Sequence, residues 1–253
     1  MINHTAITQR FKKYEPSLKA SLDRGINYAI TEGAAVLGGA PVEFSGGFAY
    51  TLWAADFNLL AMSRGVSRVA NLAGRPGARR VFWSPDESGG EASPGPHARA
   101  PFPAAIFVAD FLGKEGTPAV KELDTKSDLM GAYAMYGGEN GNLQRVAIVN
   151  MRLYNGTTDR ERGEDTFKVE VGDEVGSVRV QRLRADKGVA AMGFDFGGAE
   201  SNVSWAGEQW SFKVNEGKGH FLGDRKEEER VEVKDGIASV VVPDSEAVIV
   251  FVE

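Results

Sequence analysis

The stretch that decides the fold runs from residue 26 to residue 70, where INYAIT (26–31) and VSRVA (66–70) flank FAYTLWAADFNLLAMSR (48–64). The two outer segments have the length and apolar content of short buried strands. The middle segment carries apolar residues at helical spacing, and Gly65 stands where a helix-ending glycine is expected. Strand, helix, strand is the repeat of an α/β barrel or a doubly wound sheet. Two strands cannot close a barrel of eight, so the sequence predicts an incomplete unit.

The segments on either side of this unit extend the same pattern. Residues 7–22 have helical spacing, with Pro16 expected to restart the helix and Gly25 to end it. Residues 71–100 are rich in glycine and proline and resemble a long functional loop or a partly disordered one. A helix from Pro103 to Leu112 is expected to close this half.

From about Thr117 the pattern changes to alternating segments separated by turns, which is typical of an antiparallel β-sandwich. The clearest local signal is Asp235-Gly236 between two strand-like runs, which favours a two-residue hairpin turn. The predicted strands are Leu143–Tyr154, Thr166–Val171, Val175–Leu183, Gln209–Val214 and the run Arg230–Phe251. The predicted class is therefore α+β, with an incomplete (β/α) barrel end over residues 1–113 and a β-sandwich over residues 114–253.

Composition excludes several functions. The chain has 35 acidic and 29 basic residues and no long basic run, so nucleic acid is not an expected partner. No apolar stretch approaches the roughly 20 residues that cross a bilayer, and the first residues lack the apolar core of a signal peptide. There is no cysteine, and His4 and His220 have no partners at metal-ligand spacing, so neither a metal nor a cofactor is expected.

Candidate site residues lie at the predicted strand end and in the loop beyond it. Glu32 follows the first strand, and active sites of α/β barrels gather at the C-terminal ends of strands. A plain loop residue is the alternative. In the loop, Arg79 and Arg80 offer a charged partner for a carboxylate, and Trp83 offers a stacking face. Solvated arginines are the alternative here.

Two further groups of residues have both a structural and a functional interpretation. Trp53 is expected in the core of its helix, and Trp205 and Trp210 in the sandwich core or at its edge, unless they form a sugar platform. Three sequons would accept glycans in a secretory pathway, although chance matches to so short a motif are common. Their acceptors are Asn3, Asn155 and Asn202.

Several stretches taken together, in order along the chain, resemble glycoside hydrolase family 79, which contains β-glucuronidases and relatives of heparanase. The barrel-end stretches are Asn3–Ile7, Thr31–Gly33, Phe44–Phe57 and Gly65–Val69. Those that resemble the family's C-terminal β-domain are Val149–Thr157, Arg179–Leu183, Val203–Trp210 and Asp244–Val250. The resemblance covers nearly the whole chain and implies a carbohydrate partner, a β-glucuronide or a glycan that contains uronic acid.

The resemblance also implies residue roles. Family members are retaining hydrolases with an acid/base glutamate that follows an asparagine and a nucleophile after the seventh strand, which Glu32 matches. The pair Asn215-Glu216 lies in the β-rich part, where it is expected to be a turn. The acid/base would then belong to a missing upstream barrel region, the chain alone would be inactive, and its full-length parent would be secreted. Two departures from the family stand out: Ala70–Gly74 lacks a histidine, and Gly33 begins an apolar rather than a polar run.

Two other functions stay open at this stage. The sandwich is alternatively a non-catalytic module that braces a barrel or binds polysaccharide. A plain structural or adhesion sandwich is disfavoured, because the resemblance includes the barrel end.

Overall fold

The computed structural model describes residues 2–34, 45–74, 81–84, 95–114, 118–137, 141–156, 161–193, 203–224 and 226–253. Arg79, Arg80 and Asn202, three of the predicted site residues, lie outside the described residues. Among the described residues, no helix is both long and apolar enough to span a bilayer.

The N-terminal segment forms two short helices joined by a 3-10 turn, as the spacing predicted. They are α1 (His4–Phe11), η1 (Lys12–Tyr14) and α2 (Glu15–Leu22). Asn3 caps α1, because its Oδ1 accepts a hydrogen bond of 2.7 Å from the backbone N–H of Ala6. Pro16 occupies the first turn of α2, where its missing N–H costs no helical hydrogen bond.

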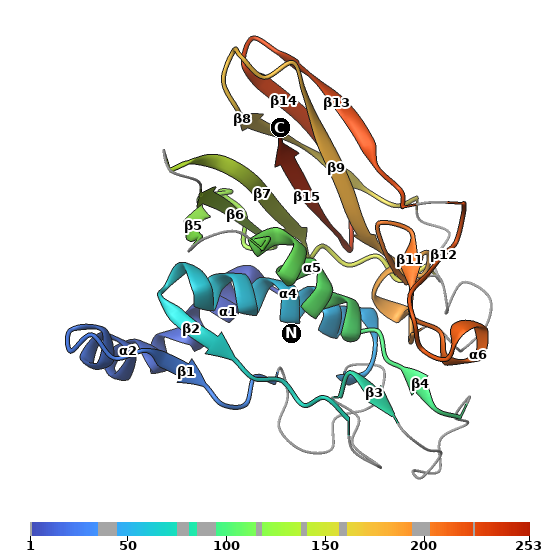
Figure 1. The fold of residues 1–253 in the computed structure, drawn as a ribbon, viewed down its shortest axis with the longest axis horizontal. Helices are drawn as coiled ribbons and strands as arrows, with labels where there is room; N and C mark the ends of the chain where they lie inside the picture. The colour runs from blue at the N-terminus through green and yellow to red at the C-terminus, as the bar shows by residue number, and fades with distance from the viewer. Residues whose placement is uncertain are drawn as a thin grey trace.

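The strand–helix–strand unit is confirmed by the structure. Strands β1 (Tyr28–Ile30) and β2 (Val66–Val69) pair in parallel and are connected through the helix α4 (Phe48–Ser63). Nearly every residue from Phe48 to Ala61 is buried, so α4 is covered on all sides. In Figure 1 it lies between the β1–β2 pair and the strands of the C-terminal half.

Residues 71–100 are not only loop. Within their described part, β3 (Trp83–Ser84) and β4 (His97–Ala98) pair antiparallel and form a small ribbon beyond the end of β2. Helix α5 (Phe102–Leu112) follows and begins one residue earlier than the predicted start at Pro103, which lies in its first turn. It packs beside α4 and against the C-terminal strands (Figure 1).

The C-terminal half consists of antiparallel strands in two layers. The large layer has the order β12-β11-β10-β9-β15-β7-β6-β5, and the small layer has the order β8-β14-β13. Strand β13 joins the layers, because its first residues pair with β9 and its last pair with β14. The strands are β5 (Ala119–Leu123), β6 (Met130–Gly137), β7 (Asn142–Asn150), β8 (Glu164–Glu170), β9 (Ser177–Arg184), β10 (Ser204–Trp205), β11 (Glu208–Gln209), β12 (His220–Phe221), β13 (Glu229–Lys234), β14 (Ile237–Pro243) and β15 (Glu246–Val252), with the short helices η2 (Gly188–Ala190) and α6 (Phe212–Asn215) between them.

Both faces of the large layer are covered, by different partners. Along β15, Ile249 and Phe251 face the helices, whereas Val248 and Val250 face the small layer. Successive side chains of a strand point to opposite faces, so this strand is apolar at every core position instead of alternating with polar residues. The large layer is therefore the central element of the chain.

The hairpin prediction is confirmed and one strand prediction is wrong. Asp235 and Gly236 connect β13 to β14 with φ of +51° and +70°, the two left-handed residues of a two-residue turn. Of the predicted strand Gln209–Val214 only Gln209 is in a strand, β11, because Ser211 Oγ accepts a hydrogen bond from the N–H of Val214 and caps the short helix α6 instead. Strands β5 and β6 were not predicted.

Candidate active site

The turn that carries Glu32 is held against the end of β2. The backbone N–H of Ala70 donates to the carbonyl of Ile30 at 2.9 Å, and the N–H of Gly33 donates to the carbonyl of Ala70 at 2.7 Å. These two hydrogen bonds continue the pairing of β1 and β2 beyond the last residue of each strand. Glu32 therefore lies at the C-terminal end of the strand pair, as predicted, and its side chain is exposed.

Gly33 has no room for a side chain. A Cβ atom at this position would lie 2.8 Å from Cγ1 of Val69, and the residue is buried. The Tyr50 hydroxyl of α4 donates to the Gly33 carbonyl at 3.5 Å. The turn is thus packed directly on β2 and α4, which explains why a glycine follows Glu32 here.

Trp83 lies on the ribbon beyond β2, and its side chain is 43% exposed. It lines a pocket together with Phe102, Trp210 and Phe212. Phe102 stands edge-on to Trp210, with ring centroids 5.6 Å apart. The structure thus brings Trp83 together with two aromatic residues of the β-domain that the resemblance did not connect to it.

The other tryptophans are in the core. Trp53 is 5% exposed and stacks between Tyr50 and Phe57, with ring centroids 5.4 and 4.8 Å away. Trp205 is fully buried, and its Nε1 donates to Asp110 of α5 at 2.7 Å. The core prediction for Trp53 and Trp205 is confirmed, and Trp210 is half-buried at the sheet edge.

A buried ionic cluster that the sequence did not reveal joins the two halves. His4 Nδ1 lies 3.1 Å from both carboxylate oxygens of Asp56, and His4 Nε2 lies 2.9 Å from Oε1 of Glu122. Carboxylates only accept hydrogen bonds, so both ring nitrogens must donate and His4 is a cation. Burial lowers the pKa of His4, but the bonds to Asp56 and Glu122 outweigh it and raise the pKa to about 10.

Further contacts complete this ionic cluster. Arg64 Nη2 bonds Glu122 at 2.5 Å, and the hydroxyl of Tyr133 donates to Asp56 at 2.7 Å. The hydrogen bond from His4 is the main cause that lowers the pKa of Glu122. A Cβ at Gly131 of β6 would lie 1.9 Å from Asp56 Oδ1, so only glycine lets that carboxylate reach the sheet. Among the described residues no group of three or more acidic or histidine side chains is arranged to hold a metal ion.

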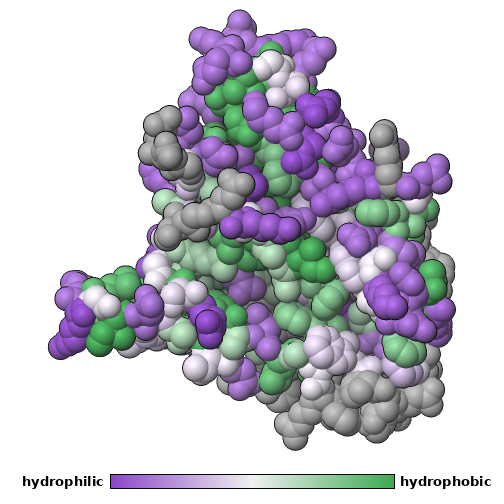
Figure 2. Space-filling model, viewed as in Figure 1, coloured by the Kyte–Doolittle hydropathy of each residue, from purple (hydrophilic) through white to green (hydrophobic). Residues whose placement is uncertain are grey.

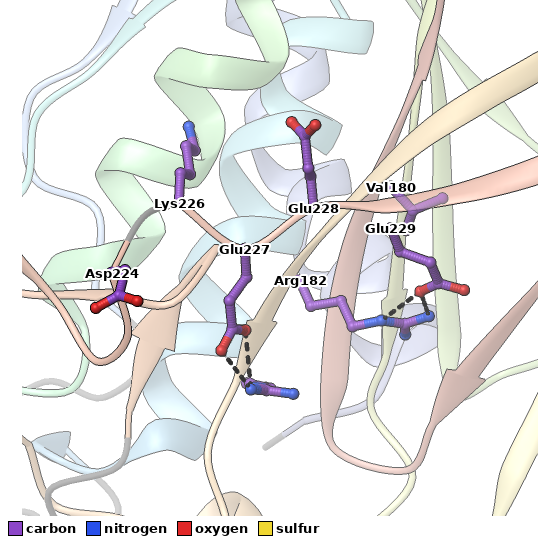
Figure 3. Close-up of a pocket in the computed structure, with 8 residues that line it drawn as sticks. Val180, Arg182, Asp224, Lys226, Glu227, Glu228 and Glu229 are labelled. Carbon is purple, nitrogen blue, oxygen red and sulfur yellow. Dashed lines mark hydrogen bonds and ion pairs between the residues drawn. The ribbon is translucent and has the colours of Figure 1, made fainter.

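A charged groove of about 580 Å³ lies where β9 meets β13. Figure 3 shows Glu229 pointing toward Arg182, whereas Lys226 and Glu228 point away from this pair. Arg182 bonds Glu229 at 2.6 Å and Glu246 at 3.0 Å, and Arg184 bonds Glu227 at 2.8 Å. Burial raises the pKa of Glu246, whereas these arginines favour its charged form. Since these charges already pair within the protein, we do not place the sugar site here.

The structure describes two of the three sequon asparagines and the Asn215-Glu216 pair. Asn3 is half-buried and caps α1, whereas Asn155 is exposed. Asn215 is the last residue of α6, and Glu216 follows it in the left-handed conformation with φ +53°. This pair is a helix end and turn, as predicted.

Residues 132–249 match the family model described as the glycosyl hydrolase family 79 C-terminal beta domain. This part of the chain is similar to the C-terminal β domain of glycosyl hydrolase family 79. The family 79 match covers strands β7 to β14, the end of β6 from Ala132 onward and β15 up to Ile249. No curated protein sequence matches the chain.

Solved structures share the fold over nearly the whole chain. A 4-O-α-L-rhamnosyl-β-D-glucuronidase from Fusarium oxysporum aligns with a TM-score of 0.78 at 20% identity, over 99% of this chain and 49% of its own. An α-L-arabinofuranosidase from Thermotoga maritima aligns with a TM-score of 0.56 at 15% identity, over 99% and 48%. The bifunctional glucanase-xylanase CelM2 from a metagenome library aligns with a TM-score of 0.51 at 12% identity, over 94% and 33%.

These likenesses concern the fold. They confirm the predicted α+β class, with a barrel end followed by an antiparallel sandwich. The chain spans about half the length of the Fusarium and Thermotoga enzymes it matches, and about a third of CelM2.

Proposed function

We propose that this chain is the rear part of a retaining glycoside hydrolase that acts on β-glucuronides, with Glu32 as the nucleophile. The observation that carries the proposal is the place of Glu32: it is exposed two residues past the end of β1 in the parallel strand pair, on a turn held by Ala70, in a chain that matches a family 79 domain. The C-terminal ends of such strands are where barrel enzymes hold their catalytic side chains.

The chemistry assigned to Glu32 is the first half of a double displacement. Its carboxylate attacks the anomeric carbon and forms a glycosyl ester, while a second carboxyl group protonates the departing oxygen; water then cleaves the ester with that second group as base. The two groups must stand about 5 to 5.5 Å apart. We assign the second group to barrel strands that would precede residue 1, because Asn215-Glu216 is a helix end in the β domain.

Substrate binding in this proposal uses the loop after β2. A uronic acid carries a carboxylate, which Arg79 and Arg80 would bind, and Trp83 would supply a stacking face. The parent protein would be secreted, and of the two described sequon residues, Asn3 and Asn155, Asn155 is the more exposed.

Covalent trapping tests the role of Glu32. A chimera that joins the front half of the Fusarium oxysporum enzyme to residues 2–253 is treated with 2-deoxy-2-fluoro-β-glucuronyl fluoride, whose leaving group needs little acid catalysis. Peptide mass spectrometry is expected to find the adduct on Glu32, and Glu32→Gln is expected to lose both the adduct and turnover of 4-nitrophenyl β-D-glucuronide. Glu216→Gln, at an exposed acidic residue of the β domain, controls for nonspecific labelling. An adduct on another residue, or unchanged turnover in Glu32→Gln, overturns the assignment.

The alternative is a module that braces a barrel without catalytic work of its own. It is favoured by the contacts that tie α1, α4 and α5 to the large layer, namely the ionic cluster and the bond from Trp205 to Asp110. In Figure 2, apolar residues also gather across the middle of the face shown, over α4 and α5, where a further part of a barrel would pack. A chimera that folds and hydrolyses the substrate equally with Glu32→Gln would favour this reading.

A further inference from the structure

An aromatic pocket of about 420 Å³ lies between the two halves of the chain. We use this name for the hollow lined by the rings of Trp83, Phe102, Trp210 and Phe212, to whose lining His97 also belongs. Trp83 and Phe212 remain 43% and 48% exposed. Large apolar side chains left open around a hollow are typical of a binding site, because a soluble protein otherwise buries them.

The two halves contribute opposite walls of the aromatic pocket. Trp83 and His97 come from the β3–β4 ribbon, which continues the barrel-like unit. Trp210 and Phe212 come from the segment between β11 and β12, where Ser211 caps α6 and so turns the chain toward the ribbon. In Figure 1 this segment and the ribbon approach each other at the lower right. The β domain therefore reaches over to the end of the molecule that carries Glu32.

The rings are held in place before any ligand binds. The indole of Trp83 lies against the backbone of Gly74, where a Cβ atom would come within 2.2 Å of its Nε1. Phe102 is fixed edge-on between Phe82, at 6.2 Å, and Trp210, at 5.6 Å between ring centroids. A platform that is already rigid loses little conformational freedom on binding.

The aromatic pocket is connected to the Glu32 turn by a short chain of backbone contacts. Gly33 bonds the carbonyl of Ala70 at 2.7 Å, and the N–H of Trp83 bonds the carbonyl of Ala73 at 3.1 Å. Only the extended segment between Ala70 and Ala73 separates these two contacts, and three residues span at most about 10 Å. A short oligosaccharide held at Glu32 is thus long enough to reach Trp83.

We propose that the aromatic pocket is a sugar-binding subsite, in which Trp83 and Phe212 stack on a pyranose of the same glycan whose glycosidic bond lies at Glu32. An apolar C–H face suits the rings, and the hydroxyl edge needs polar partners. Ser84 and His97 bring polar side chains to the lining of the pocket. The identity of the ligand as a sugar rests on the proposed function, but the site itself is tested by binding and not by turnover.

The test titrates residues 1–253 with a hyaluronan hexasaccharide, in which glucuronic acid alternates with N-acetylglucosamine, and follows binding by calorimetry. Trp83→Ala and Phe212→Ala are each expected to weaken binding about three- to tenfold, the range for a lost aromatic contact. Trp83→Phe keeps a flat ring and is expected to retain most of the affinity. Leu153→Ala removes an exposed apolar side chain, 66% exposed, that does not line the pocket, and serves as the matched control.

A positioning variant separates stacking from mere exposure. Gly74→Ala leaves every ring in the sequence but displaces the indole, so it is expected to weaken binding as much as Trp83→Ala and to shift tryptophan fluorescence. Urea unfolding of each variant shows whether the fold is intact. A folded Trp83→Ala, Phe212→Ala double variant that binds the hexasaccharide as tightly as the parent overturns the proposal.

The outcomes also distinguish the subsite from the proposed function. If Glu32 is not labelled while the aromatic variants still weaken binding, the nucleophile assignment falls and the subsite stands. Absence of saturable binding at millimolar hexasaccharide overturns the subsite alone. A dimer that Trp83→Ala dissociates in sedimentation also overturns it, since a second copy would then fill the pocket.

Discussion

The two faces of the large layer are equally buried but are held in different ways. The face toward the small layer is almost uniformly aliphatic, with Val180, Val240 and Val248 among its fully or nearly fully buried residues. The face toward the helices combines large rings such as Tyr133 and Trp205 with the ionic cluster. Aliphatic burial needs only volume and alternation, whereas the second face depends on individual polar contacts that cannot be exchanged. The difference indicates that the specificity of this fold resides where the helices meet the sheet.

Among tests of the difference between the two faces, removal of Asp56 is expected to have the largest effect. Asp56→Ala leaves the His4 cation and the Tyr133 hydroxyl without their buried acceptor, so we expect the free energy of unfolding to fall by about 3–5 kcal/mol. Urea unfolding followed by circular dichroism measures this. Lys19→Ala, which removes an exposed helix-surface ion pair, is the control and is expected to change stability by about 0.5 kcal/mol or less. Equal losses in the two variants would contradict the picture.

The pH dependence of stability sharpens the same contrast. The pKa of His4 is raised from 6.5 to about 10 in the folded protein. The contribution of the His4 cation to the free energy of unfolding is therefore fully present below pH 6.5 and is lost as the pH rises toward 10. We expect the difference in urea midpoint between the parent and His4→Gln to shrink over this range. A difference that stays constant from pH 6 to about pH 10 would show that His4 is not held as a cation.

Gly131 and Gly137 allow a smaller test within one strand. Alanine at Gly131 places a Cβ 1.9 Å from Asp56 Oδ1, so we expect a loss of about 1–3 kcal/mol in unfolding free energy. Alanine at Gly137 of the same strand meets Gln144 Cγ at 3.6 Å, an ordinary contact. There we expect no loss, and a gain of up to about 1 kcal/mol because glycine is unfavourable inside a strand. Thermal unfolding of both variants compares them directly, and similar shifts would contradict the close approach of Asp56.

The smallest expected effects compare the faces themselves. Ile249→Val, toward the helices, and Ile148→Val, toward the small layer, remove one methylene each from sites that are 0% and 1% exposed. Each is expected to cost about 0.5–1.5 kcal/mol in denaturant unfolding. A markedly smaller cost at Ile249 would mean that the helices separate from the sheet before the sandwich unfolds.

Much of the architecture was predictable because its signals are local. The helix α4 is bounded by Gly47 and Gly65, the hairpin turn is written in Asp235-Gly236, and β15 is a continuous apolar run. The predicted strand through Val214 failed because a cap by Ser211 competes with extended structure, and propensity alone does not weigh the two. Strand β6, MGAYAMYG, was missed because it is buried on both faces and interrupted by glycine, so it shows no alternation.

The candidate site divides in the same way. The place of Glu32 at a strand end followed from the order of elements, and the choice of Trp83 followed from its type within a glycine-rich loop. The residues that line the pocket together with Trp83 could not be predicted from the sequence, since Phe212 was predicted to lie in a strand of the sandwich.

By itself the sequence determined the helices, the parallel strand unit, the hairpin and the family resemblance, because each depends on neighbours along the chain. Only the tertiary structure decided that His4 meets Asp56 and Glu122, 52 and 118 positions away, and that Phe212 faces Trp83 across a pocket. Such contacts are made by packing elements that are distant in the chain, and their residues show no periodicity or spacing that would identify them beforehand.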